Sequence, residues 1–321
     1  MGNRSFEGRK SSRDSIRGCL LGVAIGDALG APFEHVPPGA TNQAMNRMGG
    51  RITDFQHCLD LGPGMWTDDT GMTLASCRAF VDAERTGRGV EPCFREAFER
   101  WCGSDECKRP GMTVRRAASS GRADKGSWAN GALMRISPVA LYGFLKGLDR
   151  RSTAGLAYEA AGFTHGHPLA TLPAVEGALA VLSIQRGEAG VPAPLGEPGS
   201  AVPGLVEGSE ALDRYRGKRG DRIEATHPST GLFMWRQVLE RCLWLAPGRS
   251  SWADLPPFEE GILTVVNGSF DKDTAGAVGG ALLGAWWGAE AIPERWRRNV
   301  WRCERIVSLA DQLTDTVRPA R

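Results

Sequence analysis

Two short acidic segments, far apart in the chain, carry the side chains best suited to chemistry. The first, Trp66–Thr70, reads Trp-Thr-Asp-Asp-Thr, and the second, Ser269–Thr274, reads Ser-Phe-Asp-Lys-Asp-Thr. An apolar segment with helical spacing follows each one at once, so each places two carboxylates and at least one threonine hydroxyl at a predicted helix start. Neighbouring carboxylates repel one another unless a cation lies between them.

Helix capping is the alternative interpretation of these segments. Asp and Thr are favoured N-caps, and a helix N-terminus favours negative charge. A single Asp would meet that need, whereas each segment carries two, and the pattern occurs twice. All-oxygen ligands of this kind suit Mg²⁺, Mn²⁺ or Ca²⁺ and suit Zn²⁺ poorly. Together the segments indicate a divalent-cation site, while either one alone is also consistent with a cap.

Two further segments have polar side chains in special positions. Gly126–Ala132 is a glycine-bounded polar loop before an apolar segment, where backbone N–H groups could bind phosphate. An ordinary helix entry with Asn130 as N-cap is the alternative. Thr164–Pro168 contains His165 and His167, which do not share a helix face and so make a poor zinc pair.

A glycine-rich helix is expected over residues 15–31. Its glycines recur with a period of four: Gly18, Gly22, Gly26 and Gly30. That period gives the helix one smooth side, which another backbone can approach closely. Each glycine costs about 1 kcal/mol of helix propensity, so tight packing must compensate. Pro32 is expected to end the helix, with Asp27 inside it and Glu34 in the following loop.

The remaining apolar spacing is helical and strand signals are scarce, which predicts an all-α fold, a compact orthogonal helical bundle. Residues 1–14 are expected to be a disordered tail, and residues 15–321 a single catalytic domain with a Pro- and Gly-rich insertion at about 187–222. The other predicted helices are 70–83, 93–101, 114–120, 132–144, 153–161, 169–186, 231–245, 258–267, 274–290 and 293–314.

Composition excludes several classes of protein. The 321 residues include 41% hydrophobic residues, enough for a sizeable core, and their net charge of +2 does not suggest a nucleic-acid-coating protein. Eight cysteines without a Cys-x-x-Cys pair indicate reduced thiols, and the N-terminus shows no secretory signal. We interpret the apolar stretch 275–292 as a core helix and the arginines of 295–302 as a solvated helix face. A cytoplasmic monomer without membrane association is expected.

The ordered set of motifs resembles the ADP-ribosylglycohydrolase family, whose type member is the dinitrogenase reductase-activating glycohydrolase. The motifs that carry the resemblance are G-x-x-x-G-D-A-L-G-A-P-x-E (Gly22–Glu34), W-T-D-D-T (Trp66–Thr70), G-S-W-A-N-G-A-L-M-R (Gly126–Arg135), T-H (Thr164, His165) and D-x-D-T (Asp271–Thr274). They run in the family's order and cover residues from about 15 to 290.

The resemblance implies a cleft with two divalent metal ions, Mg²⁺ or Mn²⁺, as cofactors. The implied metal ligands are Thr67, Asp68, Asp69, Asp271, Asp273 and Thr274. The implied catalytic carboxylates are Glu34, Asp69 and Asp68, with Glu34 or Asp69 as general base. The implied substrate-binding residues are Gly111, Ser127, Trp128, Ala129, Asn130, Gly131 and His165.

The sequence departs from the family pattern at two positions. Ala129 stands where members often have glycine, which would narrow the loop. Arg109-Pro110-Gly111 stands where arginine-specific members often have Asp-Ile-Gly, so the Asp assigned a catalytic role there is absent. The second departure puts an arginine-linked substrate in doubt more than the fold or the metals.

The function implied is metal-dependent hydrolysis of the glycosidic bond at C1″ of ADP-ribose, which releases ADP-ribose from a modified protein or another acceptor. Cleavage of that bond develops oxocarbenium character, and two metals could orient the ribose hydroxyls and activate water. ADP-ribose and ADP-ribosylated protein are the expected partners, with nucleic-acid-linked ADP-ribose also open. The alternatives are a catalytically silent ADP-ribose-binding or structural protein on the same fold, and a metal-dependent hydrolase that attacks nucleotide phosphates.

Overall fold

A computed structural model describes residues 12–34, 50–58, 60–188, 190, 230–243, 252, 255–317 and 319. Within these ranges every regular element is a helix, and the β-pairing consists of isolated bridges such as that between Asp124 and His165, which confirms the all-α prediction. The α-helices are α1 (Ser12–Gly30), α3 (Asp68–Thr86), α4 (Val90–Cys102), α5 (Met112–Ser120), α6 (Ser137–Lys146), α7 (Arg150–Gly162), α8 (Pro168–Gln185), α11 (Gly231–Leu243), α12 (Phe258–Gly268), α13 (Lys272–Trp287), α14 (Glu294–Asn299) and α15 (Cys303–Thr316). Short 3-10 turns are η1 (Ala31–Phe33), η2 (Asn130–Ala132) and η4 (Ala289–Ala291).

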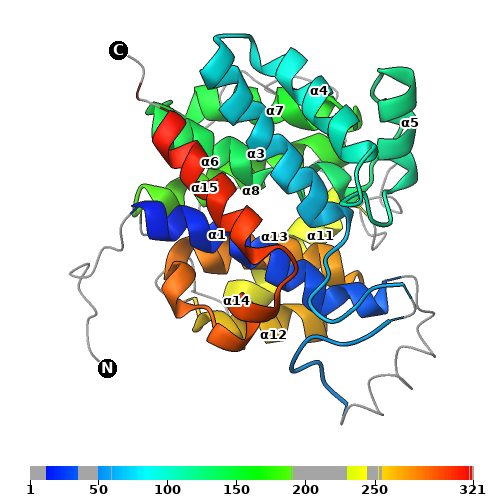
Figure 1. The fold of residues 1–321 in the computed structure, drawn as a ribbon, viewed down its shortest axis with the longest axis vertical. Helices are drawn as coiled ribbons and strands as arrows, with labels where there is room; N and C mark the ends of the chain where they lie inside the picture. Colours follow the sequence, from blue (N-terminus) through cyan, green and yellow to red (C-terminus); the bar gives the residue numbers. More distant parts are fainter. Residues whose placement is uncertain are drawn as a thin grey trace, which may run out of the picture.

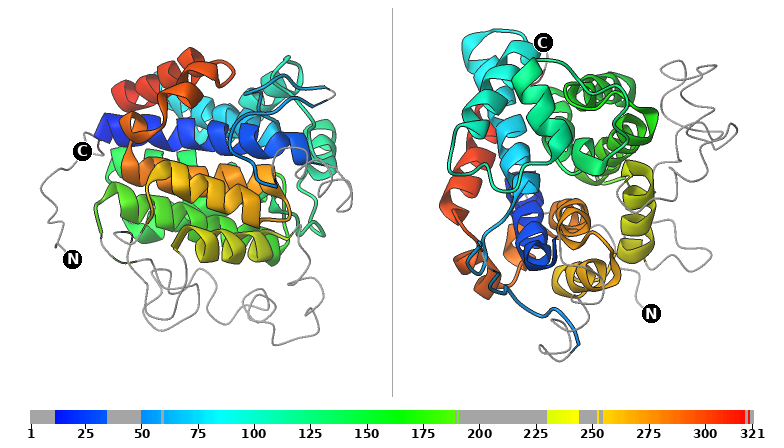
Figure 2. Two further views of the ribbon diagram at one scale, coloured as in Figure 1. Left: turned by 90° about the horizontal axis from the view of Figure 1, so that it is seen from below. Right: turned by 90° about the vertical axis from the view of Figure 1, so that its right-hand side faces the viewer.

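The helices are arranged around α1 and α13, the most extensively paired elements (Figure 1). Helices α3 and α15 pack on one side of α1, and α13 lies on its other side (Figure 2). Helix α8 contacts α6, α7, α11 and α13, and α12 packs against α13. One apolar cluster runs through these helices, and its largest fully buried side chains include Trp66, Trp252 and Trp296.

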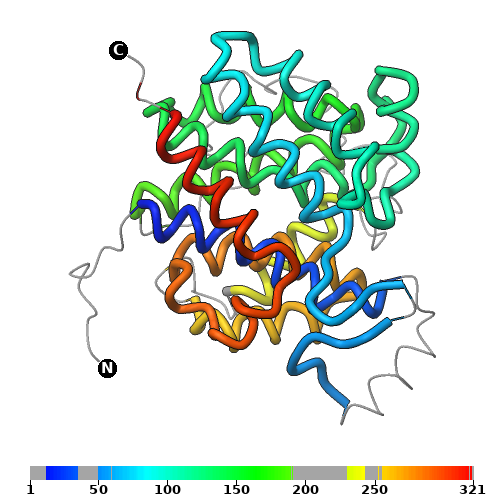
Figure 3. Tube along the Cα trace, in the orientation of Figure 1, coloured from blue at the N-terminus to red at the C-terminus, as the bar shows by residue number. Residues whose placement is uncertain are grey.

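The glycine stripe of α1 lies against a second glycine stripe on α13. The period of four in α1 predicted such a close backbone contact, but the sequence analysis did not name the partner helix. The facing pairs run antiparallel: Gly18 with Gly284, Gly22 with Gly280, and Gly26 with Gly276. A Cβ built on any of these α1 glycines would lie between 1.9 and 2.3 Å from the opposing carbonyl oxygen. Because no side chain fits at that separation, the two backbones are in direct contact. The path of both helices through the core can be followed in Figure 3.

Several predicted helix boundaries were wrong. Helix α1 begins at Ser12, so residues 12–14 of the predicted tail are helical, and Asp14 Oδ1 accepts hydrogen bonds from the backbone N–H groups of Ala289 and Glu290 at 3.1 and 3.3 Å. The rest of the tail, residues 1–11, lies outside the described residues. So does most of the predicted insertion: only 187, 188 and 190 of it are described.

The predicted helix 293–314 divides into α14 and α15 at Arg302, whose φ of 57° is incompatible with a continuous helix. Arg302 does not lie on a solvated helix face either: its Nη1 donates to the buried Glu106 carboxylate at 2.5 Å. The predicted helix 132–144 begins only at Ser137, because Pro138 has no N–H to donate and fits the first turn of α6.

Two helices, Ser12–Phe33 and Pro168–Gln185, are long and apolar enough to cross a membrane by length and composition. In the fold, 89% and 94% of their apolar windows are buried, which is the burial of core helices. Helix α13, which we interpreted as a core helix, is buried from Lys272 to Ala285.

Candidate active site

The first acidic segment is anchored to α1 through Asp27, a fully buried carboxylate inside the glycine-rich helix. It accepts hydrogen bonds from the backbone N–H groups of Thr67 and Thr70, each at 3.0 Å, and from their hydroxyls at 2.9 and 2.6 Å. Burial raises the pKa of Asp27 to about 6, against the effect of these donors. The sequence showed Asp27 but gave it no role. The signal that could have indicated a structural role for Asp27 is a carboxylate among small residues in a helix expected to be buried.

Helix α3 presents Asp68 and Asp69 in its first turn, both buried. Asp68 Oδ2 accepts a hydrogen bond from the Gly111 backbone N–H at 3.0 Å. Asp69 Oδ2 lies 3.2 Å from the Thr67 hydroxyl, and Asp69 Oδ1 is buried without a hydrogen-bond partner. The N-cap residue, Thr67, makes no side-chain capping bond. Capping therefore does not account for this pair of carboxylates.

The second acidic segment begins α13. Asp271 is its N-cap residue, again without a side-chain capping bond, and it accepts a hydrogen bond from Asn130 Nδ2 at 2.7 Å. Asp273 is 2% exposed, and its Oδ1 has no hydrogen-bond partner. The intervening Lys272 does not neutralise these carboxylates, because its ammonium donates to backbone carbonyls at the end of α12, including that of Val266 at 3.1 Å.

The two acidic segments lie close enough to repel each other. Burial raises the pKa of Asp69 well above its ordinary value, and the charges of Asp27, Asp68, Asp271 and Glu34 raise it further. Burial likewise raises the pKa of Asp273, with contributions from Asp271, Glu34 and Asp69. The helix starts that are far apart in the sequence therefore share one acidic region.

This region has the donor chemistry of a divalent-cation site. Oxygen atoms of Asp69 and Asp273 are buried and unpartnered, and only a cation or protons would offset the crowded negative charge. Carboxylate and hydroxyl oxygens are the donors that Mg²⁺ and Mn²⁺ prefer. Among the described residues, no three His, Cys, Asp or Glu side chains already form a group that could hold a metal ion. The residues fit a metal in chemistry, and the individual ligand assignments stay predictions.

The glycine-bounded loop contacts the acidic region. Its Asn130 binds Asp271, as above, and its Ser127 hydroxyl lies 2.8 Å from that of Thr113 on α5. The backbone of Ala129 pairs with that of Thr230, and the Trp128 carbonyl accepts from the Gly231 N–H at 3.2 Å. Asn130 starts the single turn η2 rather than the long helix that we predicted.

His165 lies directly beside this loop. A Cβ built on Gly131 would lie 2.9 Å from His165 Cε1 and 3.2 Å from its Nε2, so a larger residue at 131 would displace the imidazole. Burial lowers the pKa of His165 to about 3, and the ring is neutral at ordinary pH. The structure thus brings the loop and His165 together, next to Asp271.

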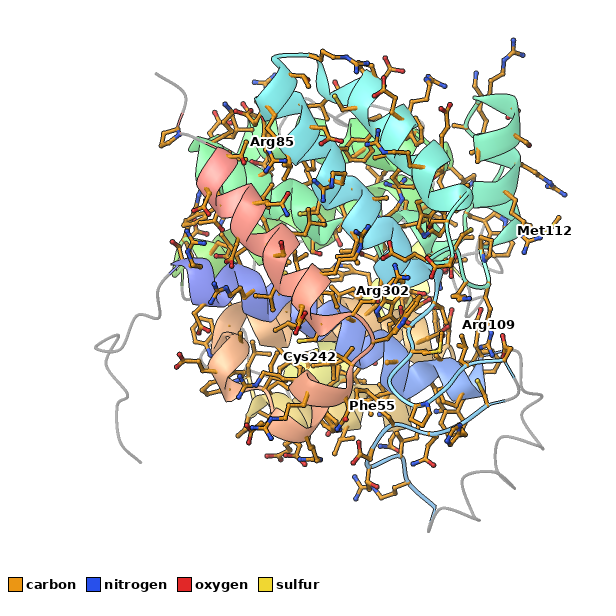
Figure 4. The ribbon with its side chains drawn as sticks, in the orientation of Figure 1. Phe55, Arg85, Arg109, Met112, Cys242 and Arg302 are labelled. Carbon is orange, nitrogen blue, oxygen red and sulfur yellow. The ribbon has the colours of Figure 1, made fainter. Side chains whose placement is uncertain are left out.

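Glu34 is held by Arg109, which the sequence analysis noted without giving it a function. The guanidinium donates from Nη1 to Glu34 Oε2 at 3.2 Å and to the Ala31 carbonyl at 2.8 Å, and from Nε to Asp60 at 2.8 Å. Figure 4 labels Arg109 near the C-terminal end of α1. Two residues later, the Gly111 N–H binds Asp68. One short segment therefore contacts both Glu34 and the first acidic pair.

The fold is all-helical, and buried carboxylates at two helix starts lie beside a glycine-bounded loop, as expected for a hydrolase of the family that the motifs resemble. The ADP-ribosylglycohydrolase family model matches residues 9–321. The chain belongs to the ADP-ribosylglycohydrolase family, as its motifs predicted.

Individual relatives agree with this assignment. The chain is 28% identical to the ADP-ribosylarginine hydrolase Tri1 of Serratia proteamaculans, over 94% of this chain and 79% of that protein. It is 28% identical to the ADP-ribosyl-[dinitrogen reductase] glycohydrolase of Rhodospirillum rubrum, over 89% of this chain and 90% of that protein. A solved structure of an ADP-ribosylglycohydrolase-related protein complex matches with a TM-score of 0.65 and 27% identity, over 96% of this chain and all of that one.

Proposed function

We propose that this protein is a metal-dependent hydrolase that cleaves the glycosidic bond at C1″ of ADP-ribose and releases ADP-ribose from a modified protein. The observation that carries the proposal is the pair of buried, unpartnered carboxylate oxygens on Asp69 and Asp273, one from each acidic helix start. Family membership and the names of the relatives support the type of bond.

The carboxylates would act together on the distal ribose and on water. The proposed ligands of two divalent ions, Mg²⁺ or Mn²⁺, are Thr67, Asp68, Asp69, Asp271, Asp273 and Thr274. When bound, such ions would orient the ribose hydroxyls and lower the pKa of water. Glu34, whose carboxylate is held by Arg109, is the proposed general base, with Asp69 as the alternative.

The loop Ser127–Gly131 and His165 would position the nucleotide. Asn130 links the loop to Asp271, so a diphosphate held by the loop would lie next to the acidic region. Such positioning accounts for much of the acceleration when a reacting bond must meet a fixed nucleophile.

The acceptor is a separate question. The name of the Serratia protein specifies an arginine linkage. In this chain Arg109 places a cation against Glu34, which disfavours a second guanidinium at that point. We therefore propose a panel of arginine-, serine- and nucleic-acid-linked ADP-ribose, each with Mg²⁺, Mn²⁺ and EDTA.

The test of the proposed reaction is release of ADP-ribose by the wild-type protein, Asp68→Ala and Asp273→Ala. We expect turnover by the wild type and a loss of at least about 100-fold in both variants. Asp82→Ala, which removes a partly exposed carboxylate on α3 that pairs with Arg100, is the control and should retain activity. Near wild-type turnover in both active-site variants would contradict the mechanism.

The products distinguish the alternatives. Binding of ADP-ribose without any product would indicate a binding protein on the same fold. Release of AMP or ribose 5-phosphate in place of ADP-ribose would indicate attack on the phosphates.

A further inference from the structure

Arg135 is a buried guanidinium that the proposed reaction does not use. It is 0% exposed, and no described carboxylate forms an ion pair with it. Its Nη2 donates to the Ala160 carbonyl at 2.9 Å and to the Thr164 hydroxyl at 2.8 Å, while Nε and Nη1 are buried without partners. A buried charge with so few bonds is costly, and an apolar side chain of similar volume would pack more cheaply. The guanidinium also lies over the Phe98 ring, 5.1 Å from its centroid, which offsets part of this cost, but an apolar side chain would need no such compensation.

The Thr164 hydroxyl connects Arg135 to His165. Its Oγ1 lies 2.7 Å from His165 Nδ1, and both residues are 1% exposed. A guanidinium only donates, so Thr164 Oγ1 must accept from Arg135. The hydroxyl proton then has one described acceptor, His165 Nδ1. If Nδ1 carried a proton instead, the buried hydroxyl proton would be left without an acceptor, which is unfavourable.

The same geometry places the imidazole proton on the other ring nitrogen. A neutral imidazole with an accepting Nδ1 has its proton on Nε2. The Arg135 charge also disfavours a second proton on the ring, because it lowers the pKa of His165 in addition to the effect of burial. Among the described contacts none uses Nε2, and this atom lies beside Gly131 at the end of the candidate binding loop.

Backbone hydrogen bonds hold the segment around His165 independently of the contacts between Arg135, Thr164 and the ring. The Asp124 N–H donates to the Thr164 carbonyl at 3.0 Å, and the Gly166 N–H donates to the Asp124 carbonyl at 3.0 Å. The segment that contains His165 is thereby bonded to the residues just before the loop. What the backbone leaves undetermined is which ring nitrogen carries the proton.

We propose that Arg135 is a positioning residue that acts through the Thr164 hydroxyl to keep the proton of His165 on Nε2, so that the ring offers a hydrogen-bond donor to a ligand held by the loop Ser127–Gly131. The ligand's identity as ADP-ribose rests on the proposed function, whereas the state of the ring does not. Arg135 need not touch the ligand.

The test is two-bond ¹H–¹⁵N NMR of the histidine rings in the full chain. The signals of His165 are assigned as those that are lost in His165→Gln. We expect an unprotonated Nδ1 and a protonated Nε2, unchanged from about pH 5 to 8. Thr164→Val keeps the shape but removes the hydroxyl, and should give a mixture of ring tautomers. Thr164→Ser, the matched control, should keep the proton on Nε2. Arg135→Met should also shift the tautomers, and Thr164→Val carries the test if that variant does not fold.

A protonated Nδ1 in the wild type, or an unchanged ring in Thr164→Val, would overturn the proposal. Calorimetric titration with free ADP-ribose adds a functional measurement, in which Thr164→Val should bind about tenfold more weakly. If the wild type releases no ADP-ribose but the tautomer responds as described, the proposed function fails and the positioning role of Arg135 stands. If turnover is normal and the tautomer does not respond, only the positioning role of Arg135 fails.

Discussion

The backbone of Gly30 lies against the backbone of Asp273. A Cβ on Gly30 would lie 2.2 Å from the Asp273 nitrogen, so the last residue of α1 contacts the first turn of α13. One turn earlier, Asp27 binds Thr67 and Thr70 at the start of α3. The C-terminal end of α1 therefore joins both acidic helix starts, and the glycine stripe positions the site as well as packing the core.

Substitution of a stripe glycine should destabilise the whole fold. In Gly26→Ala the new Cβ would lie 1.9 Å from the Gly276 carbonyl oxygen. Neither atom can rotate away, because the Cβ is attached directly to one backbone and the oxygen belongs to the other, so α1 and α13 would have to separate. We expect a loss of about 3 kcal/mol or more in the free energy of unfolding, measured by urea denaturation. Gly155→Ala is the control: a Cβ there meets nothing within 4 Å, and it should be neutral or stabilising. Equal stability of the two variants would contradict the packing.

Loss of the Asp27 carboxylate should loosen the start of α3. In Asp27→Asn the amide nitrogen would face the backbone and hydroxyl donors of Thr67 and Thr70, which an amide cannot satisfy as a carboxylate does. We expect about 1–3 kcal/mol lower stability by denaturant unfolding. Asp82→Asn, whose partly exposed carboxylate pairs with Arg100, should change stability by less than about 0.5 kcal/mol.

Of the two contacts made by α1, its glycine contact with α13 could be predicted from the sequence, and its Asp27 contact with the start of α3 could not. The period of four in α1 predicted a close helix contact, and α13 carries Gly276, Gly280 and Gly284 with the same spacing, which identifies the partner once both are considered. The role of Asp27 was not predictable in the same way. Its donors come from Thr67 and Thr70, and no local pattern says that these residues fold back onto the C-terminal end of α1.

Arg109 should affect turnover through Glu34. Arg109→Gln removes the guanidinium that binds Glu34, Asp60 and the Ala31 carbonyl, so the proposed base loses its anchor. We expect kcat for ADP-ribose release to fall by about 10- to 100-fold, the scale of a small misplacement. Arg109→Lys should be intermediate, because an ammonium cannot bridge these partners as a planar fork does.

The control for this prediction is Arg116→Gln. The Arg116 side chain is 67% exposed and lies 3.8 Å from Asp124, so its loss should leave kcat unchanged. A kcat for Arg109→Gln equal to that of Arg116→Gln would show that Glu34 needs no anchor or has no part in the reaction.

The stability of the metal-free protein should fall as pH rises. Burial raises the pKa of Asp69 and Asp273 above their unfolded values, and that of Asp27 to about 6. Groups of this kind stabilise the fold when protonated, and the contribution is lost as pH rises through the folded pKa. Divalent cations would replace the lost protons. We expect the rise in Tm on replacing EDTA with Mn²⁺ to be larger at about pH 8 than at about pH 5.

His165 acts in the opposite sense and must be separated from this effect. Its folded pKa of about 3 lies below the unfolded value, so its contribution is present above about pH 6.5 and is lost as pH falls. The His165 contribution is the same in EDTA and in Mn²⁺ at one pH, so it cancels when the two Tm values are subtracted. A Tm difference that does not depend on pH would contradict the carboxylate prediction.

The candidate site divides similarly into predictable and unpredictable parts. The acidic segments could be found because two carboxylates beside a hydroxyl exceed what a helix cap needs, and the structure shows neither Thr67 nor Asp271 capping its helix by a side chain. The contact between Arg109 and Glu34 could not be found, because 75 residues separate the two and Arg109 adopts a φ of 46° that its local sequence does not demand. Interpretation of Arg302 failed for the same reason: its partner Glu106 comes from a distant loop.

The most direct measurement is calorimetric titration of Mn²⁺ into the wild type, Asp69→Asn and Asp273→Asn, two changes that keep side-chain shape and remove one charge each. We predict saturable binding by the wild type and a loss of about 100-fold or more in affinity in both variants, because one helix start alone cannot hold the ions. Absence of Mn²⁺ binding by the wild type, or wild-type affinity in either variant, would contradict a shared cation site.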